Sequence, residues 1–133
     1  MAYGHSNIQA IHPTTLMFTK EKHLSQTGDC IIAVAADKAV ADFSPEFKAK
    51  LKNPDAKLTI LIEAGGLNQI IHAFGSAKLV LTHPTDSVVR KSDYFSDRTL
   101  AVNADKSSLD LPRELVEKLK NPKQKINITL ILS

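Results

Sequence analysis

Tryptophan is absent from the sequence and aromatic residues make up only 5% of it, so the core has to be built mainly from aliphatic side chains. Cys30 is the single cysteine, which excludes an intrachain disulfide and favours a reducing compartment. We interpret it as a small buried hydrophobic residue rather than a nucleophile. The longest apolar runs are too short for a membrane-spanning helix, and residues 1–9 are too polar for a signal peptide. We therefore expect a cytoplasmic protein with no membrane partner.

Motifs that would identify an enzyme or a metal protein are also missing. The sequence contains no Gly-rich phosphate loop, no paired-cysteine zinc motif and no nucleophile elbow. The catalytic residues and the cofactor therefore stay unknown, no metal site is assigned, and whether the protein is an enzyme is left open. The formal net charge of +3 is too small to indicate a nucleic-acid partner by itself.

The composition is globular, with 43% hydrophobic and 23% charged residues over 133 positions, and it is internally repeated. When residues 29–63 are laid over residues 97–131, 15 of 35 positions are identical, whereas chance would give roughly two or three. His12-Pro13-Thr14 and His83-Pro84-Thr85 extend the match at a slightly larger offset. We predict a single domain over residues 1–133, with copy one at about 5–63, copy two at about 76–131 and a connecting strand at 64–75.

Each copy shows the same pattern of strands around one helix. Apolar and polar residues alternate over 58–63 and 126–130, which is typical of half-buried strands. Further strands are expected at residues 8–11, 15–19, 30–35, 68–74, 78–82, 87–90 and 98–103. Pro45 and Pro112 suit the first turn of a helix, which Pro54 and Pro122 end. The expected fold is α+β, mainly β: a β-sandwich-like single domain of two tandem structural repeats, each with several strands and one short helix.

Six segments follow one another in an order typical of a known family. They are His12-Pro13-Thr14, Thr19-Lys20-Glu21, Gly28-Asp29-Cys30-Ile31, Ala36-Asp37-Lys38, Leu81-Thr82-His83-Pro84-Thr85-Asp86 and Asp97-Arg98-Thr99-Leu100-Ala101-Val102. From about residue 5 to residue 133 the chain resembles the archaeal family catalogued as domain of unknown function 371. The resemblance implies an archaeal source and a compact β-sandwich-like fold with two structural repeats. It implies no activity and no catalytic residues.

The repeated His-Pro-Thr segments form the first candidate site. If the two copies bring them together, two imidazoles and two hydroxyls from His12, Thr14, His83 and Thr85 would suit a metal or a phosphate-bearing ligand. The alternative is a repeated strand corner, in which the threonine hydroxyls cap local backbone groups.

The repeated Ala-Asp-Lys segments form the second candidate site. Asp37, Lys38, Asp105 and Lys106 follow predicted strands, where loops leave a sheet and functional groups often lie. The aspartates could accept a proton or hold a divalent cation, and the lysines could neutralise an anionic substrate. The alternative is a carboxylate that satisfies turn amides beside a solvated lysine.

Lysines gather around the C-terminal ends of both predicted helices. The two lysine patches consist of Lys48, Lys50, Lys52 and Lys57 in copy one and Lys118, Lys120, Lys123 and Lys125 in copy two. Such patches can bind a nucleic-acid backbone without sequence preference. The alternative is a solvated face that complements the helix dipoles, and no aromatic residues interleave with these lysines.

Three hypotheses of function follow. The leading one is a small-molecule binding or regulatory module for an anionic ligand, with a site where the duplicated motifs meet. The second is a small metal-assisted enzyme that uses Asp37/Asp105 and Lys38/Lys106. The third is sequence-independent RNA or DNA binding through the two lysine patches. Nothing in the sequence specifies an oligomeric state.

Overall fold

The computed structural model describes residues 1–25 and 27–133. Within these ranges the strands are β1 (Ala2–Tyr3), β2 (Thr15–Thr19), β3 (Ile31–Ala33), β4 (Lys57–Ala64), β5 (Leu67–Phe74), β6 (Asp86–Arg90), β7 (Thr99–Ala101) and β8 (Lys125–Leu132). The helices are α1 (Pro45–Leu51) and α2 (Arg113–Leu119), and two 3-10 helices are η1 (Val40–Asp42) and η2 (Ser108–Asp110). The predicted α+β, mainly β class is confirmed.

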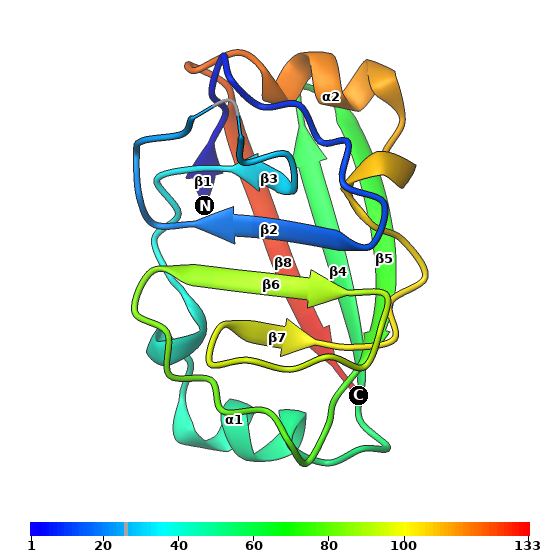
Figure 1. The fold of residues 1–133 in the computed structure, drawn as a ribbon. Helices are drawn as coiled ribbons and strands as arrows, with labels where there is room; N and C mark the ends of the chain where they lie inside the picture. Colours follow the sequence, from blue (N-terminus) through cyan, green and yellow to red (C-terminus); the bar gives the residue numbers. More distant parts are fainter. Residues whose placement is uncertain (26) are drawn as a thin grey trace.

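The strands form two four-stranded sheets, one with the order β1-β8-β4-β5 and the other with the order β3-β2-β6-β7. Figure 1 shows the second sheet in front of the first, with its strands running across the long strands β4, β5 and β8 behind it. Helices α2 and α1 lie at opposite ends of the molecule, at the top and the bottom of this view (Figure 1). No helix in the described part of the chain is long and apolar enough to cross a membrane.

The core lies between the sheets and is aliphatic, as the scarcity of aromatic residues predicts. On β4 the side chains of Leu58, Ile60 and Ile62 are fully buried, whereas those of Thr59 and Leu61 between them are partly exposed. Alternate residues of a strand point to opposite faces of the sheet, so one face of β4 belongs to the core. The strand predicted over 58–63 is confirmed.

Helix α1 begins where its proline predicts. The side chain of Ser44 caps the helix by accepting a hydrogen bond from the N–H of Phe47, and Pro45 occupies the first turn. In α2 the proline stands one position earlier, because Pro112 is the N-cap itself and makes no side-chain capping hydrogen bond.

Two predicted strands are wrong. Residues 8–11 and 78–82 are irregular, because Ala10 and Leu81 have φ angles of 52° and 58°. Extended backbone needs a negative φ, so one residue in the left-handed region interrupts a strand. The strands predicted at 30–35 and 98–103 form only over three residues each, as β3 and β7, and Ala35 and Asn103 beyond them both have a φ of 52°.

The elements follow the same order twice along the chain, as β2-β3-η1-α1-β4 and as β6-β7-η2-α2-β8. Strand β2 pairs in parallel with β3, and β6 pairs in parallel with β7, while β2 and β6 join in antiparallel. Isolated bridges join Tyr3 to Val34 and Phe74 to Val102, so β5 has the position in one half that β1 has in the other. These correspondences support an internal duplication. The boundaries of the copies and the sandwich-like classification stay predictions.

Candidate functional site

The two His-Pro-Thr segments act on their own backbone. The Nδ1 atom of His12 accepts hydrogen bonds from the N–H groups of Thr14 and Thr15, each at 3.1 Å. The Nδ1 atom of His83 accepts equivalent bonds from Thr85 at 3.3 Å and from Asp86 at 2.9 Å. Each imidazole therefore closes the turn that leads into β2 or β6. The alternative of a repeated strand corner expected the threonine hydroxyls in this local role.

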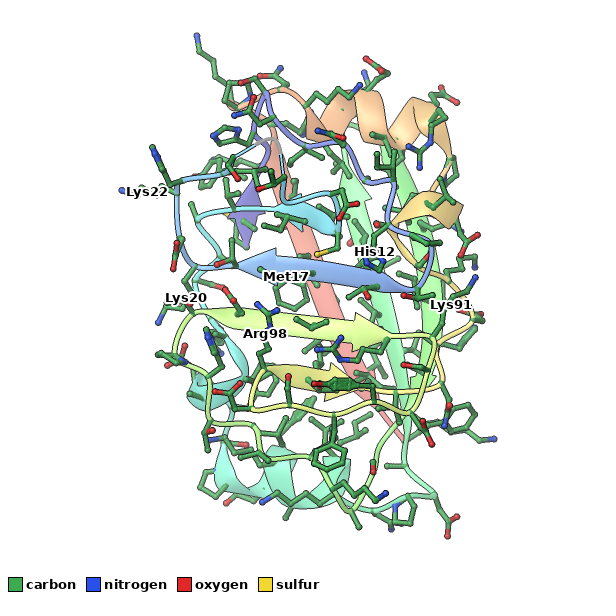
Figure 2. The ribbon with its side chains drawn as sticks, in the orientation of Figure 1. His12, Met17, Lys20, Lys22, Lys91 and Arg98 are labelled. Atoms are coloured by element: carbon green, nitrogen blue, oxygen red, sulfur yellow. The ribbon has the colours of Figure 1, made fainter. Side chains whose placement is uncertain are left out.

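The two histidines do not converge on one site. In the antiparallel pair of β2 and β6, Thr15 lies opposite Arg90 and Thr19 lies opposite Asp86, so the two strands start at opposite ends of the pair. Four residues of strand separate these starts by about 13 Å. In Figure 2, His12 lies with Lys91 toward one end of β2, and Lys20 and Arg98 lie toward the other. No group of three or more His, Cys, Asp or Glu side chains among residues 1–25 and 27–133 could hold a metal ion.

A closed polar network surrounds the His83 turn. The carboxylate of Asp86 accepts hydrogen bonds from the hydroxyls of Thr19 at 2.8 Å and Thr85 at 3.2 Å and pairs with the guanidinium of Arg98 at 3.2 Å. These contacts hold the corner together. Because the side chain of Asp86 is only 12% exposed, the carboxylate has little surface left for a ligand.

The two Ala-Asp-Lys segments also lie apart. They follow β3 and β7, the two outer strands of their sheet, with β2 and β6 between them. Asp105 and Lys106 hold the free edge of β5: the carboxylate accepts the N–H of His72 at 3.0 Å and the ammonium donates to the carbonyl of Ile70 at 2.7 Å. A carboxylate pair bridging one metal ion is therefore not formed by Asp105 and its counterpart.

Asp37 and Lys38 occupy the equivalent position beside β8. Asp37 pairs with the terminal ammonium of Met1 at 3.1 Å, and its backbone N–H donates to the carbonyl of Met1. Lys38 is exposed and makes no hydrogen bond or ion pair with any residue in the described part of the chain. Its counterpart Lys106 donates to the carbonyl of Ile70 in β5. Lys38 has the equivalent position beside β8, but no strand of the described part of the chain lies there to accept its hydrogen bond.

A groove of about 420 Å³ opens beside these two residues. We call it the α1–β8 groove. Its floor is apolar and its rim is polar. The floor consists of Phe18, Phe43, Phe47, Ile128 and Leu130, and the rim includes Asp37, Lys38 and Asp42. The rings of Phe43 and Phe47 stack at 5.1 Å between centroids. Both rings pack against the hydrophobic core and stay partly exposed.

Backbone groups of β8 also face the groove. Lys57 and Ser133 exchange both of their backbone hydrogen bonds, and alternate residues of an antiparallel pair bond to the same neighbour. The N–H and C=O groups of Ile128 and Leu130 therefore point away from β4, toward the groove. Strand β1 covers β8 only at Lys125 and Ile126. No residue in the described ranges pairs with the outward backbone groups of Ile128 and Leu130.

The equivalent position beside β4 is closed. Strand β5 pairs with β4 over eight residues, and Ile60 and Ile62, the counterparts of Ile128 and Leu130, lie opposite Ile71 and Gln69. On that side the counterparts of the two phenylalanines are Leu111 and Leu115. These leucines are only 2% and 1% exposed. The α1–β8 groove is thus the space that a longer edge strand fills on the β4 side.

The charged side chains on the rim differ in whether they already have hydrogen-bond or ion-pair partners. Asp42 accepts the N–H of Ala39 at 2.9 Å and the ammonium of Lys20 at 3.0 Å. These contacts, the Ala39 amide first, lower the pKa of the Asp42 carboxyl, which holds η1 in place. The terminal ammonium of Met1, which also lines the groove, pairs with Asp37. Lys38 is the rim charge that has no partner in the described part of the chain and can meet a ligand.

The lysine patches lie at opposite ends of the molecule, since α1 and α2 do (Figure 1). Lys48 is partly buried and donates to the carbonyl of Ala41 at 2.9 Å, and Lys120 pairs with Glu117 at 3.3 Å. The other six lysines of the two patches are exposed. The two patches therefore do not form one continuous surface, and nucleic-acid binding stays a prediction.

Cys30 is half-buried rather than fully buried. Burial raises the pKa of its thiol, with a further contribution from Asp29. A thiol with a raised pKa carries little thiolate at neutral pH, so the interpretation of Cys30 as a packing residue rather than a nucleophile is supported.

Comparison with known proteins identifies a family and a relative. The family model described as "Domain of unknown function (DUF371)" matches residues 1–133. An uncharacterized protein of Methanocaldococcus jannaschii is 50% identical over 125 residues, which are 94% of this chain and 92% of that protein. The resemblance seen in the sequence is confirmed, and neither description names a ligand or a reaction.

Proposed function

The chain belongs to the family described as domain of unknown function 371, and we propose that it is a binding module whose ligand lies in the α1–β8 groove. One observation carries the proposal. The apolar side chains of Phe43, Phe47, Ile128 and Leu130 stay partly exposed in the groove, whereas their counterparts on the β4 side are buried.

The dimensions and chemistry of the groove support a ligand site. Its volume of about 420 Å³ lies in the range of ligand pockets, which combine an apolar lining with a few polar groups. The ligand needs an apolar body to cover Phe43 and Phe47. It also needs an acceptor group, carbonyl or anionic, for the ammonium of Lys38.

The proposed site includes one of the two Asp-Lys pairs that the leading hypothesis from the sequence named. Asp37 and Lys38 belong to the site, but Asp105 and Lys106 do not, because they already bind β5. The site therefore uses only one of the two Asp-Lys pairs, although the groove itself lies between α1 of copy one and β8 of copy two. A cytoplasmic location remains an expectation from the single cysteine.

The test is a binding screen read out on the protein itself. A ¹⁵N-labelled chain is titrated with a library of small apolar acids and short peptides, and ¹H–¹⁵N spectra identify the amides that shift. We expect binders to move the amide signals of Lys38, Phe47, Ile128 and Leu130. Phe47→Ala is expected to weaken these binders about tenfold or more, because it removes one of the three phenylalanine rings of the floor.

Phe95→Ala is the matched control, since Phe95 is 42% exposed and lies outside the groove. It is expected to leave binding unchanged. Binders that shift only amides outside the groove, or a library without any binder at these four amides, would contradict the proposal.

A further inference from the structure

We infer that the ligand of the α1–β8 groove is an extended peptide segment of a partner protein, which adds to β8 as a further antiparallel strand. The inference rests on the proposed function, because it names the class of ligand for the same groove.

The backbone of β8 offers the hydrogen bonds that a strand requires. The outward N–H and C=O groups of Ile128 and Leu130 have no partner in the described part of the chain. A strand laid along this edge would make four backbone hydrogen bonds with these two residues. Peptides bind exposed sheet edges in this way, with backbone bonds for affinity and alternate side chains for specificity.

Strand β5 shows the register that such a segment takes. On β4, Ile71 lies opposite Ile60 and Gln69 lies opposite Ile62. The residue between them, Ile70, has its carbonyl bound by the ammonium of Lys106 at 2.7 Å. A peptide on β8 would therefore pair with Ile128 and Leu130 through two alternate residues and present the carbonyl of the residue between them to Lys38.

The same register predicts the side chains of the peptide. The two residues that pair with β8 point toward the core side of the sheet, as the fully buried Ile71 and the partly exposed Gln69 do on β4. On β8 that side is the floor of Phe43 and Phe47. The residue between them points outward, as Ile70 does at 43% exposure. The peptide therefore carries apolar side chains at alternate positions and accepts polar ones between them.

A single segment fits the groove better than the edge of a second copy of this chain. On the β4 side, β5 is enclosed between β4 and the loop of residues 102–106, through the Phe74–Val102 bridge and the contacts of Asp105 and Lys106. Residues 36–38 enclose the α1–β8 groove in the equivalent position. A second copy would bring β4 along with its β8, and this neighbouring strand would meet the loop.

The first experiment supplies the strand within the chain. A variant carries the sequence of residues 67–71, Leu-Asn-Gln-Ile-Ile, directly before Met1, behind a new initiator methionine. Since the extension continues β1, it is held close to the groove at high effective concentration. We expect hydrogen exchange at the amides of Ile128 and Leu130 to slow by about tenfold or more relative to the parent chain.

The matched control carries Leu-Asn-Pro-Ile-Ile instead, in which proline removes the N–H that pairs with Leu130. It is expected to give at most a small part of the protection. An extension that leaves the exchange of both amides unchanged would overturn the inference.

The second experiment supplies the peptide from outside. Random peptides displayed on phage are selected against the parent chain, and synthetic versions of the selected peptides are titrated by fluorescence polarisation. We expect alternating apolar positions in the selected sequences. Lys38→Ala should weaken binding by about three- to tenfold, because it removes one hydrogen bond to the peptide backbone.

Lys106→Ala is the matched control and should leave peptide affinity unchanged. Peptides that bind equally well to parent and Lys38→Ala chains, or a dimer whose formation protects Ile128 and Leu130 in place of a peptide, would overturn the inference. If small acids still bind the groove in that case, the proposed function stands without its peptide. If nothing binds there, both fall together.

Discussion

The β4 side and the β8 side of the molecule are built from equivalent elements, yet only the β4 side is closed. Strand β5 pairs with β4 over eight residues, whereas β1 pairs with β8 over two. Leu115 is consequently buried at 1% exposure, and its counterpart Phe47 lies half-covered in a groove. An edge strand of eight residues therefore makes the β4 side part of the core, whereas a strand of two residues leaves the α1–β8 groove open on the β8 side.

Substitution of Leu115 and of its counterpart Phe47 should give the greatest difference in stability between the two sides. Leu115→Ala should lower the free energy of unfolding by about 2–5 kcal/mol, because it leaves a cavity in the closed core. Phe47→Ala should cost clearly less, although it removes more atoms, because its ring already faces solvent. Urea denaturation of both variants measures the difference. Equal losses would mean that Phe47 is packed as closely as Leu115 and would break the comparison.

A smaller effect is expected from the two lysines that follow the repeated aspartates. Lys106→Ala removes a hydrogen bond to β5 and should lower the free energy of unfolding by about 0.5–1.5 kcal/mol. Lys38→Ala should leave it unchanged, since Lys38 binds nothing in the described part of the chain. Thermal unfolding of the two variants provides the measurement. A loss on Lys38→Ala as large as that on Lys106→Ala would show that Lys38 already has a structural partner.

The smallest effect concerns the aspartates of the two 3-10 turns. The ammonium of Lys91, together with Ser107, lowers the pKa of Asp110 to about 2. A carboxyl whose pKa is lower in the folded state stabilises the fold above its unfolded pKa, and this contribution is lost as the pH falls from about 4 toward 2. Lys91→Met should therefore reduce the drop in Tm over that pH range. This effect of the substitution should be smaller in high salt, because Asp110 is exposed and salt screens its charge.

Lys20→Met is the equivalent change beside Asp42, whose pKa is also lowered. It should act in the same direction and by a smaller amount. A Tm profile between pH 5 and pH 2 that is unaffected by Lys91→Met would remove the ion pair of Lys91 and Asp110 from the account of acid stability.

Local patterns in the sequence predicted those elements that depend on neighbouring residues. The alternation over 58–63, the segment 15–19 and the start of α1 at Pro45 all agree with the structure. The strands at 8–11 and 78–82 were wrong, because apolar composition does not reveal a left-handed residue such as Ala10 or Leu81. Neither residue is a glycine or asparagine, so no turn signal marks these positions.

Only some of the candidate residues named from the sequence line the α1–β8 groove. Asp37 and Lys38 lie on the rim of the groove, whereas His12 and His83 serve the turns before β2 and β6. Phe43 and Phe47 were not among the candidate residues. The one signal that could have separated them is their replacement by leucine in the second copy, which marks the two helices as unequally packed.

The mainly β class, the aliphatic core and the family could all be predicted from the sequence, because they depend on alternation, composition and the order of motifs along the chain. The sequence also showed which polar residues occur twice. Only the tertiary structure decided which copy of Asp-Lys binds a strand and which faces a groove. Edge pairing joins residues far apart in the chain, and a strand leaves backbone groups open wherever its neighbour is short, which no local pattern records.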